Sequence, residues 1–158
     1  MRIAIMVAAL ASLIVGCDLG ESTSPSISAS FVLTDTSGHP SSTFRSGDDF
    51  LMTLNVQNNS NLQLTYYRGD DSPDVIFDII RDGIVVASSV DGYAFVQIPS
   101  IGHLDAGHTL RGSWRAPTTL AQFPKVRLSA GSYLVRVSYP RFDQVGDGNI
   151  LTTTFTVY

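Results

Sequence analysis

The sequence is poor in several residues that usually organise a protein. Its 158 residues include one cysteine, one glutamate and one lysine, against thirteen aspartates and nine arginines. A single cysteine excludes an internal disulfide framework and a paired-cysteine zinc site. Because aspartate favours turns and glutamate and lysine favour helices, the choice of charged residues argues against a helical protein.

Excess positive charge and catalytic motifs are also missing. The formal net charge is −4, whereas a nucleic-acid-binding domain needs a basic surface that neutralises phosphates. The sequence contains no Gly-x-Ser-x-Gly, His-Glu-x-x-His or P-loop motif. We therefore expect a non-catalytic protein that has no cofactor and no nucleic-acid partner.

The N-terminus carries one short apolar run. It follows Arg2 and spans thirteen residues, Ile3–Val15. A transmembrane helix needs about 20 apolar residues, so this run is too short to span a bilayer but suits a signal peptide. We expect residues 1–16 to be a signal peptide that directs export.

The only cysteine comes directly after this run. Ile14-Val-Gly-Cys17 resembles the bacterial lipobox, in which a small residue precedes a cysteine whose thiol receives diacylglycerol. We expect Cys17 to be the lipid-bearing first residue of the mature chain, which would anchor the protein to a membrane of the bacterial cell envelope, outside the cytoplasm. Each buried methylene adds about 0.8 kcal/mol, so two or three acyl chains hold a protein stably. The alternative is an ordinary secretory signal with an incidental cysteine.

Two segments follow the signal peptide. Residues 17–26 begin with the cysteine expected to carry lipid. The residues after it are rich in Ser, Pro and Gly and show no apolar periodicity, which predicts a flexible tether. Residues 27–158 form one domain in this interpretation. About 130 residues can bury roughly two thirds of their unfolded surface, so the domain needs no disulfide or metal.

From residue 27 onward, apolar and polar residues alternate in short segments that turn signals separate. A period of two indicates β-strands, and no segment has a helical apolar stripe. About eight short strands at this spacing predict an all-β fold, an immunoglobulin-like antiparallel β-sandwich. The segments are 28–34, 50–57, 62–66, 74–81, 84–89, 94–98, 109–115, 133–139 and 151–157.

Three local features refine this fold. Asp82-Gly83 between two apolar segments predicts a tight β-hairpin. Leu128–Tyr133 has the spacing of a tyrosine corner, in which the hydroxyl of Tyr133 bonds to backbone a few residues upstream. Trp114 lies on the apolar side of its segment and is expected in the core between the sheets.

The order of these elements is similar to that of a known family. An Asn-x-Ser turn, an aromatic-Asp strand, a Leu-x-x-Gly turn, a Trp and a Gly-x-Tyr strand follow one another at Asn58–Ser60, Phe77-Asp78, Leu104–Gly107, Trp114 and Gly131–Tyr133. Over about residues 48–140 the chain resembles the BsuPI family, the intracellular proteinase inhibitor domain of bacilli. The resemblance implies a sandwich and proteinase inhibition, and it transfers no inhibitory residue.

An inhibitor needs a loop that fills a protease cleft or an edge strand that pairs with the protease. The candidate loop is Gln97–His103, with Ile98, Pro99, Ser100 and Ile101 as the contact residues. Pro99 lowers the entropy cost of ordering the loop, and either isoleucine can enter a pocket. We expect a protein partner, with a protease of the envelope favoured. The alternative is a strand-to-strand crossover with buried isoleucines.

Other functions rest on weaker patterns. His103 and His108 flank a turn but lack a third zinc ligand, and Arg68-Gly-Asp70 matches the tripeptide that integrins bind. Aspartates in loops are potential calcium ligands or a catalytic carboxylate pair. The loop aspartates leave two alternative functions open: a structural or calcium-binding envelope domain without inhibitory activity, and a hydrolase. The loop aspartates are Asp48, Asp49, Asp70, Asp71, Asp74, Asp143 and Asp147.

Overall fold

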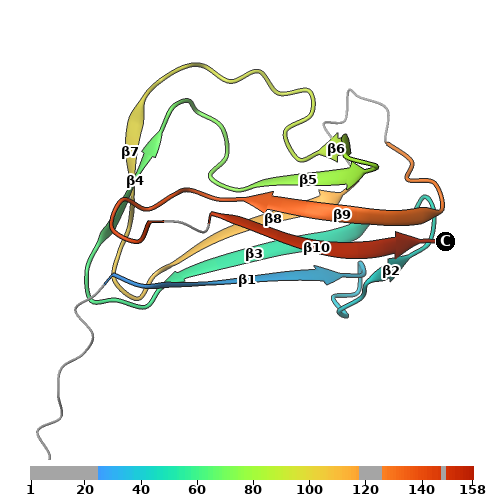
Figure 1. Cartoon of the computed structure of the whole chain (residues 1–158), viewed down its shortest axis with the longest axis horizontal. Helices are drawn as coiled ribbons and strands as arrows, with labels where there is room; N and C mark the ends of the chain where they lie inside the picture. Colours follow the sequence, from blue (N-terminus) through green and yellow to red (C-terminus); the bar gives the residue numbers. More distant parts are fainter. Residues whose placement is uncertain (1–24, 118–125, 147–148) are drawn as a thin grey trace, which may run out of the picture.

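The computed structural model describes residues 25–117, 126–146 and 149–158, and within them the fold is all-β (Figure 1). These residues contain no helix, and so none long and apolar enough to cross a membrane. The all-β prediction is confirmed, with ten strands where about eight were expected. The strands are β1 (Ile27–Thr34), β2 (Thr43–Phe44), β3 (Phe50–Asn58), β4 (Leu64–Arg68), β5 (Ile76–Arg81), β6 (Ile84–Ser88), β7 (Ser100–Leu104), β8 (Thr109–Ala116), β9 (Gly131–Ser138) and β10 (Ile150–Val157).

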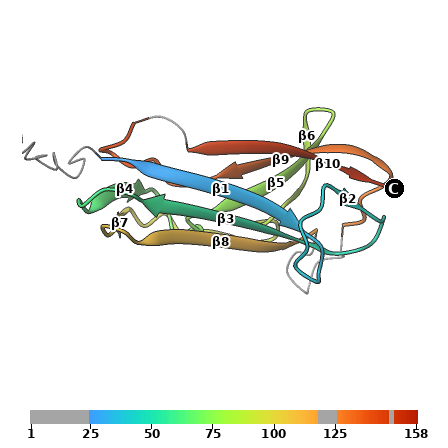
Figure 2. The ribbon, with the colours of Figure 1, turned by 90° about the horizontal axis from the view of Figure 1, so that it is seen from below.

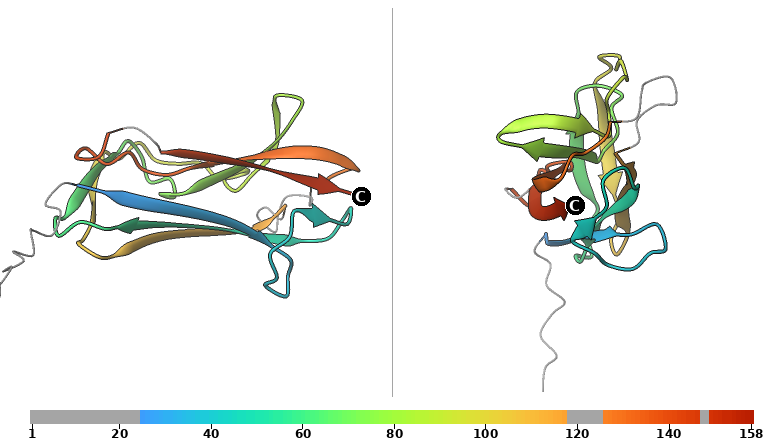
Figure 3. Two further views of the ribbon diagram at one scale, coloured as in Figure 1. Left: turned by 60° about the horizontal axis from the view of Figure 1, so that its bottom comes forward. Right: turned by 90° about the vertical axis from the view of Figure 1, so that its right-hand side faces the viewer.

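The strands form two facing layers and one small extra sheet. One layer has the order β1-β3-β8 and the other β2-β10-β9-β5-β6, and Figures 2 and 3 show the two layers lying face to face. All pairings are antiparallel except that of β2 with β10. The β-sandwich is thereby confirmed, with one short parallel pair.

Alternating side chains of the two layers fill the space between them. In β3, every second residue is buried: the apolar Phe50, Met52, Leu54 and Val56, and the polar Asn58 at the end of the strand. Trp114 on β8 is only 8% exposed, and its ring centroid lies 6.5 Å from that of Phe77 on the opposite layer. The prediction that Trp114 lies in the core between the sheets is confirmed.

The predicted hairpin and tyrosine corner are both present. Asp82 and Gly83 join β5 to β6 with positive φ angles of 51° and 79°, as a two-residue type I′ turn requires. The Tyr133 hydroxyl donates to the Ser129 carbonyl oxygen at 2.7 Å. Arg81 adds to the corner, because its Nη1 donates to the same hydroxyl at 3.1 Å.

Two predicted strands differ from the structure, and the short strand β2 was not predicted. Residues 94–98 form no strand, because the Ile98 N–H donates to the Val96 carbonyl instead of to a neighbouring strand; β7 begins later, at Ser100. The strand expected from Leu62 begins at Leu64, since the Leu62 carbonyl accepts the Asn58 side chain. The two-residue β2 has too little sequence to show a period, and its pairing comes from β10.

The small sheet of β4 and β7 continues the β3–β8 pair around a corner. It lies at the end of the sandwich where β1 begins, opposite the C-terminus (Figure 1). The fully buried Asn58 holds the corner: its Nδ2 donates to the carbonyls of Leu62, Leu104 and Asp105 at 2.7, 3.0 and 3.1 Å. Its Oδ1 accepts the Ser60 hydroxyl at 2.7 Å. One buried amide therefore fixes where β7 ends relative to β3.

Candidate partner-binding surface

The four residues predicted to contact a partner lie where the β6–β7 connection enters β7. Ile98 and Pro99 end the connection, and Ser100 and Ile101 begin the strand, so the prediction of a loop over Gln97–His103 is wrong from Ser100 onward. Ile98 is 57% exposed and Ile101 is 67% exposed, so the alternative of a crossover with buried isoleucines is wrong. Only Leu104, at the other end of β7, is buried in the core.

A tyrosine on the neighbouring strand enlarges this apolar surface. Tyr67 is the register partner of Ile101 in the β4–β7 ladder, and it is 66% exposed. Residues directly opposite each other in a sheet project on the same face, with Cβ atoms about 5 Å apart. Tyr67 and Ile101 therefore form one exposed apolar pair on the outer face of the small sheet.

The inner face of the small sheet is closed by a tyrosine over a glycine. Tyr66 is buried and pairs with Gly102, and a Cβ at Gly102 would collide with the Tyr66 ring. The Tyr66 ring also packs edge-on against Phe142, with centroids 5.4 Å apart. Glycine at position 102 thus lets the small sheet pack closely while Ile101 faces outward.

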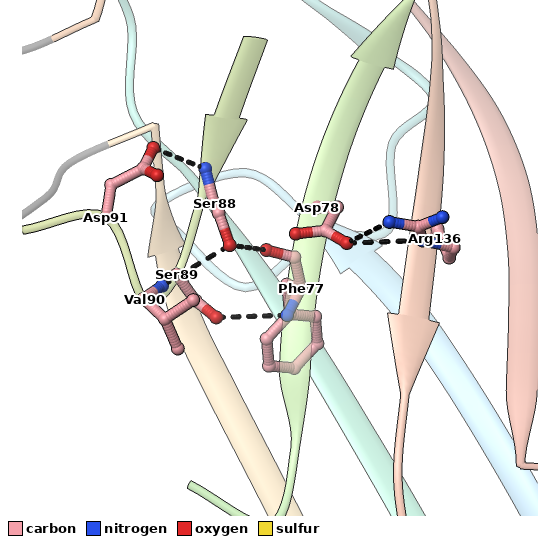
Figure 4. Close-up of polar contacts among 7 residues, drawn as sticks. All are labelled: Phe77, Asp78, Ser88, Ser89, Val90, Asp91 and Arg136. Carbon is pink, nitrogen blue, oxygen red and sulfur yellow. Dashed lines mark hydrogen bonds and ion pairs between the residues drawn. The ribbon is translucent and has the colours of Figure 1, made fainter. Parts of the chain in front are cut away.

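The β6–β7 connection, residues 89–99, is fastened where it leaves β6 (Figure 4). The Ser88 N–H donates to the Asp91 carboxylate at 2.7 Å, and the Ser89 hydroxyl accepts the Phe77 N–H at 3.0 Å. Phe77 is buried on β5, beside the ion pair of Asp78 with Arg136 at 2.7 Å. The first residues of the connection are therefore bound to the core layer.

A second fastening holds the connection near the predicted contact residues. The Val96 N–H donates to Asp71 Oδ1 at 2.7 Å, and the Val96 carbonyl accepts the Asp71 N–H at 3.1 Å. Asp71 lies in the β4–β5 connection, so two loops brace each other. The Tyr93 and Phe95 rings stack nearly parallel, at an interplanar angle of 7°. The exposed isoleucines thus follow a segment whose position is set before a partner arrives.

A small cleft borders the same surface. It measures about 190 Å³ and is lined by residues of β4, the β4–β5 connection, the first residue of β5 and Ser138–Pro140. On its wall the Tyr66 hydroxyl donates to Asp74 at 2.9 Å, and Asp74 pairs with Arg68 at 2.8 Å. Burial, and then the Asp74 bond, raises the pKa of Tyr66 to about 12. Small-molecule sites usually exceed about 300 Å³, so this cleft suits one protruding side chain.

Five of the loop aspartates, Asp49, Asp70, Asp71, Asp74 and Asp143, bond to other groups of the protein through their side chains. The Asp70 carboxylate accepts the Ser72 N–H at 3.0 Å, and hydrogen bonds from Ser72 hold the pKa of Asp70 below its ordinary value. Asp49 pairs with Arg115 at 3.0 Å. Asp143 lies 3.4 Å from the Thr65 hydroxyl. Within the described ranges no three His, Cys, Asp or Glu side chains come together as metal ligands; Asp147 lies outside those ranges.

The remaining candidates from the sequence are a pair of histidines and the Arg68-Gly-Asp70 tripeptide. His103 on β7 and His108 after the Asp105–Gly107 turn are both exposed. In the Arg68-Gly-Asp70 tripeptide both charged side chains have partners inside the domain, Asp74 for Arg68 and Ser72 for Asp70. The tripeptide is thus part of the turn that follows β4.

The lipidation prediction lies elsewhere in the chain. Cys17 and the signal peptide fall outside the described residues, as does most of the tether. Comparison with known proteins gives no further information, because no protein-family model and no curated protein match the chain.

Several residues of this surface were not predicted from the sequence. Tyr67 follows the inward-facing Leu64 and Tyr66 in alternation, so its outward position was readable from the period of two. The bracing by Asp71 and the corner bonds of Asn58 join residues far apart in the chain. No local pattern signals such bonds, and only the folded arrangement identifies them.

Proposed function

We propose that the protein is a membrane-anchored lipoprotein with a non-catalytic protein-binding domain that inhibits a proteinase of the cell envelope. The observation that carries this proposal is the exposed apolar surface of Ile98, Ile101 and Tyr67. Ile98 ends a connection that hydrogen bonds hold near both of its ends, and Ile101 and Tyr67 lie on the adjoining strands β7 and β4. The BsuPI-like order of turns and strands supports the choice of a proteinase as partner.

The physical argument concerns the cost of binding. A loop that orders only on binding spends part of its interaction energy on lost conformational freedom, whereas a braced loop spends less. Here Asp71 binds Val96, and Pro99 has a fixed φ and restricts the backbone of Ile98 before it. Interface energy concentrates in a few apolar residues that become fully buried. Ile98, Ile101 and Tyr67 are the residues of this surface that can supply it.

In this proposal the lipid at Cys17 determines where in the cell envelope the domain lies. A thioether-linked diacylglycerol keeps the domain at the membrane surface, and residues 18–26 separate it from the first strand. A membrane-held inhibitor protects neighbouring envelope proteins from proteolysis without being lost by diffusion.

The test is a titration of the domain, residues 25–158, against a panel of serine proteases with residual activity as the readout. The fragment starts at 25 because the Ser26 carbonyl accepts the Asn59 N–H. The proposal predicts stoichiometric inhibition of at least one protease, and its loss when Ile98–Ile101 is replaced by Gly and Ser.

Two results would contradict the proposal in different ways. If no protease is inhibited and calcium raises the melting temperature of the domain, the structural, calcium-binding alternative takes its place. If inhibition survives the loop replacement, the contact lies on another surface of the domain and the assignment of Ile98–Ile101 is wrong.

A further inference from the structure

One edge of β7 has no neighbouring strand within residues 25–117, 126–146 and 149–158. In these ranges β7 pairs with β4 alone. The other edge of β4 is occupied: the Thr65 N–H donates to the Gln144 side chain at 3.0 Å, and the Thr65 carbonyl accepts the Asp143 N–H at 3.0 Å. The backbone of Thr65 therefore faces away from β7.

This orientation determines which backbone groups of β7 face its open edge. In an antiparallel pair, opposite residues alternate between exchanging two hydrogen bonds and exchanging none. The backbone groups of Thr65 form their hydrogen bonds on the side of β4 that faces away from β7, so Thr65 and His103 exchange no hydrogen bonds. Tyr67 and Ile101, the pair two residues further along, exchange none either. The N–H and C=O groups of Ile101 and His103 thus point away from β4, towards the open edge.

We propose that this edge binds an extended segment of a partner protein as a third strand, with apolar residues at alternate positions and a basic residue at each end. The proposal deepens the proposed function and rests on it, because it specifies how the same surface recognises its partner. Ile101 and His103 offer two donors and two acceptors, the arrangement that β-strand addition uses.

The side chains of Tyr67 and Ile101 determine which positions of the partner segment should be apolar. A strand placed next to β7 puts a side chain opposite Ile101, which extends the exposed row of Tyr67 and Ile101 by one residue. Cross-strand pairs of aromatic and β-branched residues stabilise sheets. Natural open edges usually carry a lysine or an inward-pointing charge that prevents pairing, whereas Ser100–Leu104 contains neither lysine nor arginine.

The charges near the two ends of β7 determine which residues the partner segment should carry at its own ends. Asp105 follows β7 directly, and Asp70 and Asp71 follow Arg68, the register partner of Ser100. Arg68 is paired with Asp74 at 2.8 Å, which balances its charge. Both ends of β7 are therefore acidic, so a partner strand with Lys or Arg at its two ends is electrostatically complementary.

The experiment uses the purified full-length chain and a synthetic peptide, acetyl-Lys-Val-Thr-Val-Thr-Val-Lys-amide. Calorimetry measures affinity, and hydrogen exchange measures protection of the Ile101 and His103 amides. We expect saturable binding that slows exchange at these two amides. A peptide with Glu in place of both Lys should bind at least about tenfold more weakly. Absence of binding, or protection elsewhere only, would overturn the proposal.

Two variants at one position isolate the backbone contribution. His103→Pro removes an outward N–H that β4 does not use, whereas His103→Ala removes only the side chain. Proline is tolerated on edge strands. We expect His103→Pro to weaken peptide binding about tenfold and His103→Ala to bind like wild type. Equal binding by the two variants would overturn strand addition.

The result is separable from that of the proposed function. Inhibition of a protease that is equal in His103→Pro and His103→Ala would retain the inhibitor and reject strand addition. Peptide binding at β7 with no protease inhibited would retain strand addition and reject the proteinase as partner.

Discussion

Tyr67 on β4 and Ile101 on β7 lie directly opposite each other, and about two thirds of each residue is exposed, 66% and 67% respectively. Their neighbours in the ladder, Tyr66 and Gly102, close the inner face of the same two strands. A sheet that buries one tyrosine and exposes the next presents an apolar surface on a well-packed support. This pair is the centre of the proposed partner-binding surface.

Removing the core tryptophan should destabilise the domain strongly. Trp114→Ala deletes the side chain that links β8 to Phe77 across the two layers, so we expect a loss of about 3–5 kcal/mol in the free energy of unfolding. Urea denaturation measures it. An unfolding midpoint equal to that of wild type would contradict the placement of Trp114 in the core.

The tyrosine corner should contribute less to the free energy of unfolding than Trp114 does. Tyr133→Phe keeps the ring and removes the bonds to the Ser129 carbonyl and from Arg81. We expect a loss of about 1 kcal/mol, the usual contribution of a side-chain hydrogen bond. Thermal and urea denaturation both report it, and an unchanged stability would mean that the corner bond is replaced by water without cost.

The corner amide of Asn58 has a matched control next to it. Asn58→Asp replaces the buried donor of three hydrogen bonds by a carboxylate, so we expect a loss of at least about 2 kcal/mol. Asn59→Asp makes the same chemical change at an exposed position and should stay within about 0.5 kcal/mol of wild type. Equal effects of the two variants would show that the Asn58 side chain does not hold the corner.

Tyr66 should make the domain sensitive to alkali. Its pKa is raised from 10.0 to about 12, so the fold favours the neutral phenol. This contribution to stability is fully present below pH 10 and is lost as the pH rises from 10 through 12. Tyr66→Phe should therefore lose less stability than wild type over that range. Denaturation at several pH values tests this, and equal slopes for both proteins would contradict it.

Lipidation is tested by mass spectrometry of the protein purified from a bacterial host. We expect a mature chain that begins at Cys17 and carries the added mass of diacylglycerol and, after acylation, of a third chain. The Cys17→Ser variant should keep its signal peptide and lack lipid. An unmodified Cys17 in the wild-type protein, or cleavage at another bond, would contradict the prediction.

Much of the fold was predictable because its causes are local. The alternation in β3 follows from a side-chain period of two against one buried layer, and the hairpin at Asp82-Gly83 follows from turn chemistry. Residues 94–98 have a similar alternation but no strand beside them, and their N–H groups bond to Asp71 and Val96 instead. Alternation thus predicts a strand only where the fold also supplies a partner.

The candidate site was predictable in part. Proline between apolar residues marked the segment Ile98–Ile101, but residue type does not distinguish a buried isoleucine from an exposed one. The exposure of Ile101 depends on the β4–β7 register, which Asn58 and the Tyr66–Gly102 contact determine over long sequence distances. Those long-range contacts needed the structure.

The central claim, that Ile101 contacts the inhibited partner, has a direct test in two matched substitutions. Ile101 and Ile84 are 67% and 68% exposed, and each lies on a short strand at a sheet edge. The inhibition constant of Ile101→Ser against a protease that the wild-type domain inhibits should rise about tenfold or more. Ile84→Ser, on the distant β5–β6 hairpin, should leave it unchanged. Equal inhibition constants for Ile101→Ser and wild type would contradict the claim.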